Sequence, residues 1–187
     1  MRKLLAGMVL AAVALSLPAS AQAQRRSTSA AAAPHGKHEF GVDLGLAYVK
    51  PNGVDGGIAI GTPLDVRLGF VTAKQLMWEA RAALAFNTVG GNTAYDFEPG
   101  VNVLFANSTG GHHRGMYFTG GAGLLLADDG ANSGTAFSFN AGVGWRKPWG
   151  SAAWRYEVGF KWQSENTDLG LPSTIAIGGR IGVSLWH

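Results

Sequence analysis

The side chains in this sequence best suited to acid–base or metal chemistry are its histidines and one acidic pair. Histidine exchanges protons near neutral pH and is a frequent metal ligand. Because the chain has no cysteine, a disulfide, a thiolate zinc site and a cysteine nucleophile are excluded. The residues concerned are His35, His38, His112, His113, His187, Asp128 and Asp129.

The spacing of these residues does not assemble a reactive site. His112 and His113 are adjacent, so in an extended segment their side chains point to opposite sides. A structural zinc site takes four ligands, and no others follow nearby. Asp128 and Asp129 fall in a turn-like segment, where such acids are usually solvated. We therefore predict no catalytic residue, no metal site and no cofactor.

A second set of charges follows the two-residue period of a β-strand. From Glu39 onward, apolar residues recur at every second position. In the clearest run, Trp154–Trp162, aromatic and aliphatic residues alternate with Arg155, Glu157 and Lys161. The eight runs are Phe40–Tyr48, Ile58–Phe70, Leu76–Phe86, Tyr95–Phe105, Met116–Leu126, Phe137–Arg146, Trp154–Trp162 and Ile175–Leu185.

All charged residues inside these runs lie on the face opposite the apolar one, six acids against six bases. They are Asp43, Asp65, Glu79, Asp96, Glu98, Glu157, Arg67, Arg81, Arg146, Arg155, Lys161 and Arg180. A soluble sandwich would carry more charge on its polar face. An aromatic apolar face opposite a glycine-rich, charge-balanced face is typical of strands between lipid and a polar lumen. The pattern predicts an all-β fold, an eight-stranded antiparallel up-and-down transmembrane β-barrel.

The N-terminus has the pattern of an export signal. Arg2 and Lys3 precede an apolar run that ends at Leu17, and Ala21 and Ala23 offer small residues for cleavage. We expect a signal peptide over 1–23, a flexible periplasmic leader over 24–38 and the barrel over 39–187. After cleavage, 13 basic residues (15 minus Arg2 and Lys3) face 12 acidic ones, so a nucleic-acid partner is not expected.

The even strand number places both termini at one end, which we expect to face the periplasm. Connections Thr72–Gln75, Ala106–Gly115 and Lys147–Ser151 would share that side. Pro51–Gly56, Asn87–Thr93, Ala127–Gly134 and Ser164–Ser173 would face outward. Pro63 and Pro99 each remove a ladder donor, which predicts bulges or shortened pairing there. The run Met116–Leu126 carries no charge, and its facing stays open.

Aromatic residues gather near both ends of the runs, as two interfacial girdles would require. The periplasmic set is Phe40, Phe70, Trp78, Phe105, Trp145 and Trp154. The outer set is Tyr48, Phe86, Tyr95, Phe137 and Trp162.

The signal peptide, the eight runs and the last strand together resemble the small outer-membrane barrels of the OmpA/OmpX type, over residues 39–187. The resemblance implies a bacterial outer-membrane location, contact with outer-membrane lipid and lipopolysaccharide, and recognition of the last strand by the barrel-insertion machinery. Ile181, Val183 and Leu185 alternate as such a signal requires, but Trp186 is penultimate. We expect the barrel alone, without a peptidoglycan-binding domain.

For function, we expect a structural or surface-interaction role, with a lumen plugged by the twelve balanced charges. A pore for ions or small solutes is the first alternative. A lipid-modifying enzyme is the second, and it is disfavoured because no histidine falls near the outer rim. The sequence names no extracellular ligand.

Overall fold

The computed structural model describes residues 36–187 except positions 54, 90–91, 108–110, 129–131 and 168–169. The expected signal peptide and residues 24–35 of the expected leader lie outside the described residues. Within the described part, no helix is both long and apolar enough to cross a membrane. The strands are β1 (His38–Pro51), β2 (Gly57–Ala73), β3 (Leu76–Val89), β4 (Asn92–Ala106), β5 (Gly115–Asp128), β6 (Ser133–Trp149), β7 (Ala152–Gln163) and β8 (Thr174–Trp186).

The eight strands form one closed antiparallel barrel in sequence order, which confirms the predicted fold class. The barrel closes because β1 pairs with β8, from the pair Glu39 and Trp186 to the pair Pro51 and Thr174. Strand β1 begins at His38, one residue before the expected boundary, and the His38 amide donates to the His187 carbonyl at 3.0 Å.

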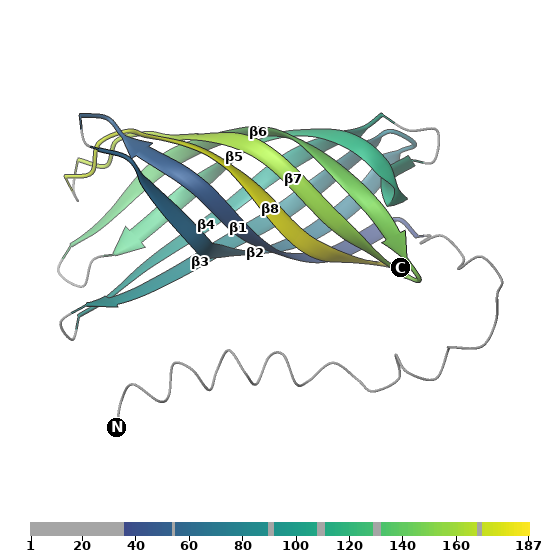
Figure 1. The fold of residues 1–187 in the computed structure, drawn as a ribbon, viewed down its shortest axis with the longest axis horizontal. Helices are drawn as coiled ribbons and strands as arrows, with labels where there is room; N and C mark the ends of the chain where they lie inside the picture. Colours follow the sequence, from purple (N-terminus) through teal and green to yellow (C-terminus); the bar gives the residue numbers. More distant parts are fainter. Residues whose placement is uncertain (1–35, 54, 90–91, 108–110, 129–131, 168–169) are drawn as a thin grey trace, which may run out of the picture. The chain divides into compact units, whose positions relative to one another are not determined.

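The barrel has two distinct ends (Figure 1). We call the end that holds the start of β1 and the finish of β8 the terminal end. It also carries the β2–β3, β4–β5 and β6–β7 connections, including the 3-10 turn η3 (Gly111–His113). The opposite loop end carries the other four connections. The β7–β8 connection includes an isolated bridge between Asn166 and Leu171.

Side chains alternate between the lumen and the outer surface, as the two-residue period predicts. In β7, Arg155 is 1% exposed whereas its neighbour Tyr156 is 42% exposed. The structure also resolves the facing of β5, which composition left open. Tyr117 is buried in the lumen and Phe118 is exposed, so odd-numbered residues of β5 point inward.

Both prolines interrupt strand pairing, as expected. Leu44 pairs with Leu64 but Leu46 pairs with Ile60, so β2 bulges within residues 61–63, a segment that includes Pro63. Pro99 keeps its place opposite Ala82 in β3, whereas the β4–β5 ladder skips residues 98–99 without changing register.

Strands β2 and β3 separate at the loop end. Their ladder stops at the pair Leu64 and Leu84, although β2 extends to Gly57 and β3 to Val89. Beyond this point each strand pairs only with its other neighbour, and the β1–β2 and β3–β4 hairpins diverge (Figure 1). The barrel wall is therefore continuous in the terminal half and notched in the loop half.

Candidate functional site in the barrel lumen

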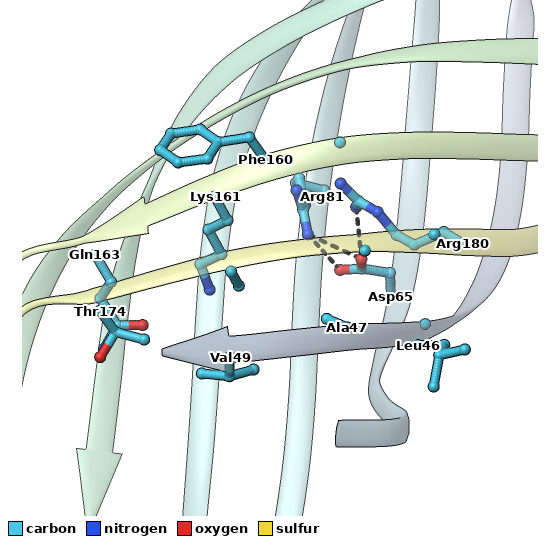
Figure 2. Close-up of a pocket in the computed structure, with 15 residues that line it drawn as sticks. Leu46, Ala47, Val49, Asp65, Arg81, Phe160, Lys161, Gln163, Thr174 and Arg180 are labelled. Carbon is cyan, nitrogen blue, oxygen red and sulfur yellow. Dashed lines mark hydrogen bonds and ion pairs between the residues drawn. The ribbon is translucent and has the colours of Figure 1, made fainter. Parts of the chain in front are cut away.

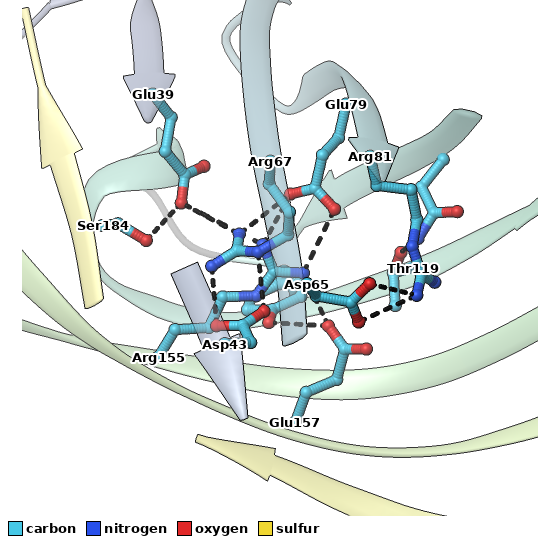
Figure 3. A network of polar contacts seen from close by, with 12 residues as sticks. Glu39, Asp43, Asp65, Arg67, Glu79, Arg81, Thr119, Arg155, Glu157 and Ser184 are labelled. Atoms are coloured by element: carbon cyan, nitrogen blue, oxygen red, sulfur yellow. Dashed lines mark hydrogen bonds and ion pairs between the residues drawn. The ribbon is translucent and has the colours of Figure 1, made fainter. Parts of the chain in front are cut away.

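The centre of the lumen is a cluster of buried ions around Arg67. Arg67 Nη2 donates to Asp43 Oδ1 at 2.8 Å. In the same ion pair Nε lies 2.6 Å from Asp43 Oδ2, and Nη1 lies 3.1 Å from Glu79 Oε2 and 3.3 Å from Glu39 Oε1. These side chains come from β1, β2 and β3 and are at most 2% exposed (Figure 3). Leaving a buried charge unpaired costs several kcal/mol of folding free energy, so each of these side chains needs an oppositely charged partner in the lumen.

Two further arginines extend the cluster across the lumen. Arg146 Nη2 lies 2.5 Å from Glu39 Oε2, and Arg155 Nη1 lies 2.5 Å from Glu79 Oε2. Arg155 also donates to Glu157 at 2.7 Å. The Tyr117 ring lies beneath both guanidinium groups, 4.6 Å from the Arg146 carbon and 4.9 Å from that of Arg155. Strands β1, β3, β6 and β7 are thus tied together through the lumen.

Towards the loop end, Asp65 and Glu157 connect a second group of ions. Asp65 accepts from Arg81 and from Arg180, each at 2.8 Å. Arg180 also pairs with Glu157 at 2.9 Å, which links this group to the central cluster. A separate ion pair joins Lys161 of β7 to Glu98 of β4, and the Ser138 hydroxyl of β6 donates to Glu98 at 2.6 Å.

Glycines make room for these side chains. A Cβ placed on Gly182 would lie 1.7 Å from Asp43 Oδ1, and one on Gly144 would lie 2.0 Å from the Tyr117 ring. A Cβ on Gly121 would lie 2.0 Å from Asn102 Oδ1. The abundance of glycine on the inward face therefore has a packing reason: large polar side chains from one strand occupy the space above glycine on the next.

An apolar layer and the η3 turn lie at the terminal end of the lumen. Met77, Leu104, Tyr117 and Trp186 form a buried cluster. Arg146 donates to the carbonyl of His112 at 3.0 Å, and the His113 ring lies 4.3 Å from that of Trp186. The side chain of His112 is itself buried.

Its burial gives His112 a perturbed protonation equilibrium. Desolvation lowers the pKa of His112 from 6.5 to about 4, and the positive charge of Arg146 acts in the same direction. His112 is therefore neutral at pH 7 and fills space at the terminal end of the lumen as an uncharged ring.

The loop half of the lumen holds a cavity of about 220 Å³ (Figure 2). Small inward residues of β1, β7 and β8, such as Gly45, Ala47 and Gly178, form one wall. Asp65 and the cations Arg81, Lys161 and Arg180 also line it. The cavity therefore lies directly above the ion network, on the side of the loop end.

The structure brings together all but one of the twelve charges singled out in the sequence. Asp96 is the exception: it is exposed near the loop end of β4 and makes no ion pair with any described residue. Sequence reasoning did not include Glu39 among the lumen charges, because this residue stands at the boundary with the expected leader, just before the first apolar run. Glu39 is 2% exposed and pairs with Arg67 and Arg146. Its two-residue spacing from Gly41 and Asp43 already placed it on the lumen face.

The last strand keeps the expected alternation, and its penultimate aromatic residue falls on the lumen face. Leu185 is exposed on the outer surface, whereas Trp186 is 6% exposed and lies 5.3 Å from the Arg146 guanidinium. The C-terminal aromatic ring thus packs inside the barrel, because the two-residue period places it on the lumen face.

The described histidines lie at the terminal end. His38 begins β1, His112 and His113 form part of η3, and His187 follows β8. His35 and Asp129 lie outside the described residues. Among the described residues, no group of three or more His, Asp or Glu side chains is arranged to hold a metal ion.

No protein-family model matches this chain, and no curated protein does. Solved structures do match. Neisserial surface protein A (NspA) shares 11% identity, with 80% of this chain and 97% of that chain covered and a TM-score of 0.55. Ail, the attachment invasion locus protein of Yersinia pestis, shares 10% identity, with 81% and 99% covered and a TM-score of 0.50. The fold is that of the small eight-stranded β-barrels. The resemblance expected from the sequence is thereby confirmed for the fold.

Proposed function

We propose that this chain is a bacterial outer-membrane β-barrel with a filled lumen and a structural or surface-interaction role. The observation that carries the proposal is the inverted distribution of polarity. Arg67 is fully buried, whereas Phe139 is 54% and Val158 is 66% exposed. A soluble protein of this size rarely exposes a continuous apolar surface, because that surface would associate. Hydrocarbon around a closed barrel accounts for both faces at once.

Strand length and aromatic placement support the same location. The strands have 12 to 17 residues, more than the roughly 9–11 that a tilted strand needs to cross a bilayer. Trp78 and Trp145 are exposed near the terminal end, and Tyr48 and Phe137 near the loop end. Aromatic rings at both borders of an apolar band are typical of the two membrane interfaces.

The ion network supports a filled lumen over a pore. Arg67, Glu79 and Arg155 meet near the barrel centre at hydrogen-bonding distances and exclude solvent from their side chains. An aqueous channel would instead leave such charges exposed. The cavity above the network lies in the loop half, where Leu125, Ala127 and Ala136 form a second buried apolar cluster, and the ion network separates it from the apolar layer of Met77 and Trp186.

We place the terminal end in the periplasm and the loop end at the cell surface, where outer-membrane lipid and lipopolysaccharide would surround the barrel. The signal-peptide pattern favours this orientation, and so do the β2–β3 and β6–β7 connections at the terminal end, which span two residues each (74–75 and 150–151). Insertion through recognition of β8 follows from the OmpA/OmpX resemblance. No step of the proposal involves catalysis or a cofactor.

Single-cysteine labelling tests location and orientation directly, because the natural chain has no cysteine to react. Asp55→Cys lies in the β1–β2 connection and Gln75→Cys in the β2–β3 connection, and both positions are exposed. On intact cells, a membrane-impermeant maleimide should label Asp55→Cys and leave Gln75→Cys unlabelled until the outer membrane is opened. Labelling of Gln75→Cys alone on intact cells would show that the terminal end faces outward, opposite to the proposed orientation. Recovery of both variants in the soluble fraction would refute the membrane location.

A further inference from the structure

The charged side chains of the described residues divide into three sets by position. The lumen holds six acids and six bases, with a net charge of zero. The loop end holds one base and four acids, a net charge of −3: Lys50, Asp55, Asp96, Asp128 and Glu165. The terminal end holds four bases, a net charge of +4: Lys37, Lys74, Arg114 and Lys147.

We call these four terminal-end cations the basic rim. All four are exposed, and no exposed Asp or Glu side chain accompanies them in the described part of that end. Glu39, the nearest acid, is buried and already paired with arginines inside the barrel. The rim therefore places four exposed cations, and no exposed Asp or Glu side chain of a described residue, at the terminal end outside the lumen.

The basic rim surrounds the barrel instead of forming one patch. Lys37 precedes β1, Lys74 lies between β2 and β3, Arg114 precedes β5, and Lys147 lies near the end of β6. In the closed strand order these positions fall on different sides of the barrel. A single acidic protein would contact only part of such a ring, whereas a surrounding layer of anionic groups would contact all of it.

The depth of the rim points to lipid phosphate. Lys147 is on the outer face, two residues beyond the exposed Trp145 and directly paired with Trp154 across to β7. Trp154 also stacks on Trp149, with 6.0 Å between ring centroids. Tryptophan rings favour the border between hydrocarbon and headgroups, and long basic side chains extend from that border to the phosphates.

We propose that the basic rim binds the phosphate groups of anionic phospholipids in the leaflet at the terminal end. The proposal rests on the membrane location given under Proposed function and adds a lipid preference. Each Lys or Arg close to an anionic surface adds attraction, and this attraction falls with salt because free ions screen it. The acidic loop end would have the opposite preference.

The tryptophans of the chain provide the test. Trp78, Trp145, Trp149 and Trp154 are exposed near the terminal end, whereas Trp162 lies towards the loop end. Brominated acyl chains quench tryptophan fluorescence on contact. Full-length mature barrel is reconstituted in vesicles that mix dibrominated phosphatidylglycerol with unbrominated phosphatidylcholine, and in the converse mixture. Comparison of the two quenching curves gives the relative binding constant of the two lipids.

The wild-type protein should favour phosphatidylglycerol by about two- to fivefold at low salt, with the preference lost near 1 M salt. The combined variant Lys37→Gln, Lys74→Gln and Lys147→Gln, which leaves Arg114 in place, should reduce the preference by at least half. Lys50→Gln at the loop end is the matched control and should not change it. An equal affinity of the wild-type protein for both lipids would overturn the proposal.

Failure of this proposal is distinguishable from failure of the proposed function. Quenching by dibrominated phosphatidylcholine alone reports insertion, whatever the lipid preference. Quenching without preference for the anionic lipid would refute the basic rim and leave the barrel in the membrane. Absence of quenching by either lipid would refute the membrane location and the rim together.

Discussion

Replacement of Glu79 by glutamine is the sharpest perturbation of the lumen network. Glu79 is fully buried, and its Oε2 lies 2.5 Å from Arg155 Nη1 and 3.1 Å from Arg67 Nη1. Glutamine keeps the shape of the side chain and removes its charge. The network then holds one more base than acid, and an amide group faces two guanidinium groups that can only donate.

The expected cost follows from the burial of these partners. Removing one member of a buried ion pair destabilises a protein by about 3–5 kcal/mol, because the remaining charge is left uncompensated. We therefore expect Glu79→Gln to lower the free energy of unfolding by about 3–5 kcal/mol. The measurement is urea unfolding of the refolded barrel in detergent, followed by tryptophan fluorescence and by the electrophoretic shift of the folded form.

Two further variants make this prediction specific. Asp96→Asn removes a carboxylate that is exposed and makes no ion pair with a described residue, so it should change stability by less than about 0.5 kcal/mol. The double variant Glu79→Met and Arg155→Met restores the charge balance and leaves Glu157 paired with Arg180, so it should cost less than Glu79→Gln alone. Equal costs for Glu79→Gln and Asp96→Asn would refute the reasoning.

Three other predictions follow from the packing, the pKa of one histidine and the strand pairing. Gly144→Ala should lower the free energy of unfolding in urea by about 1–3 kcal/mol, because its Cβ would lie 2.0 Å from the Tyr117 ring; a neutral outcome would contradict the packing role of glycine. Because the pKa of His112 is about 4 in the folded barrel and 6.5 as its ordinary value, the unfolded chain binds the proton first as pH falls. The contribution of His112 to stability should therefore decrease from about pH 6.5 to about pH 4, and a pH series of unfolding curves should show a shallower decrease for His112→Gln. In hydrogen exchange, residues 85–89 of β3 should exchange faster than residues 77–84, because only the latter pair with both neighbouring strands; equal protection would contradict the separation of β2 from β3.

The number of strands and their inward and outward faces could be predicted because an apolar outer surface and a charged lumen impose a strict two-residue period. In the segment 155–157, the side-chain types alone indicate that Arg155 and Glu157 face the lumen and that Tyr156 faces outward. For strand β5 the sequence did not indicate which residues face the lumen, because its glycines and uncharged residues are compatible with either face. Its facing is decided by Tyr117, whose ring lies under Arg146 and Arg155, a contact between strands that one run of sequence cannot reveal.

The composition of the network could be predicted better than its connections. The charge balance indicated ion pairs, but which carboxylate meets which guanidinium depends on the barrel closing β1 against β8 and on the stagger of its strands. Glu39 was missed because it stands at the boundary with the leader. Its partners Arg67 and Arg146 lie 28 and 107 residues away in the chain. Trp186 stood out in the sequence as a departure from the C-terminal signal, and its position in the two-residue period places it inside the barrel.

Planar-bilayer conductance tests the central claim, a lumen filled by its own side chains, most directly. Residues 24–187 are refolded in detergent, and insertion is verified by the heat-dependent gel shift before recording. The filled lumen predicts no conductance steps above background from inserted wild-type protein. Reproducible channel steps would contradict it and would favour a small pore that passes Arg155 and Arg180.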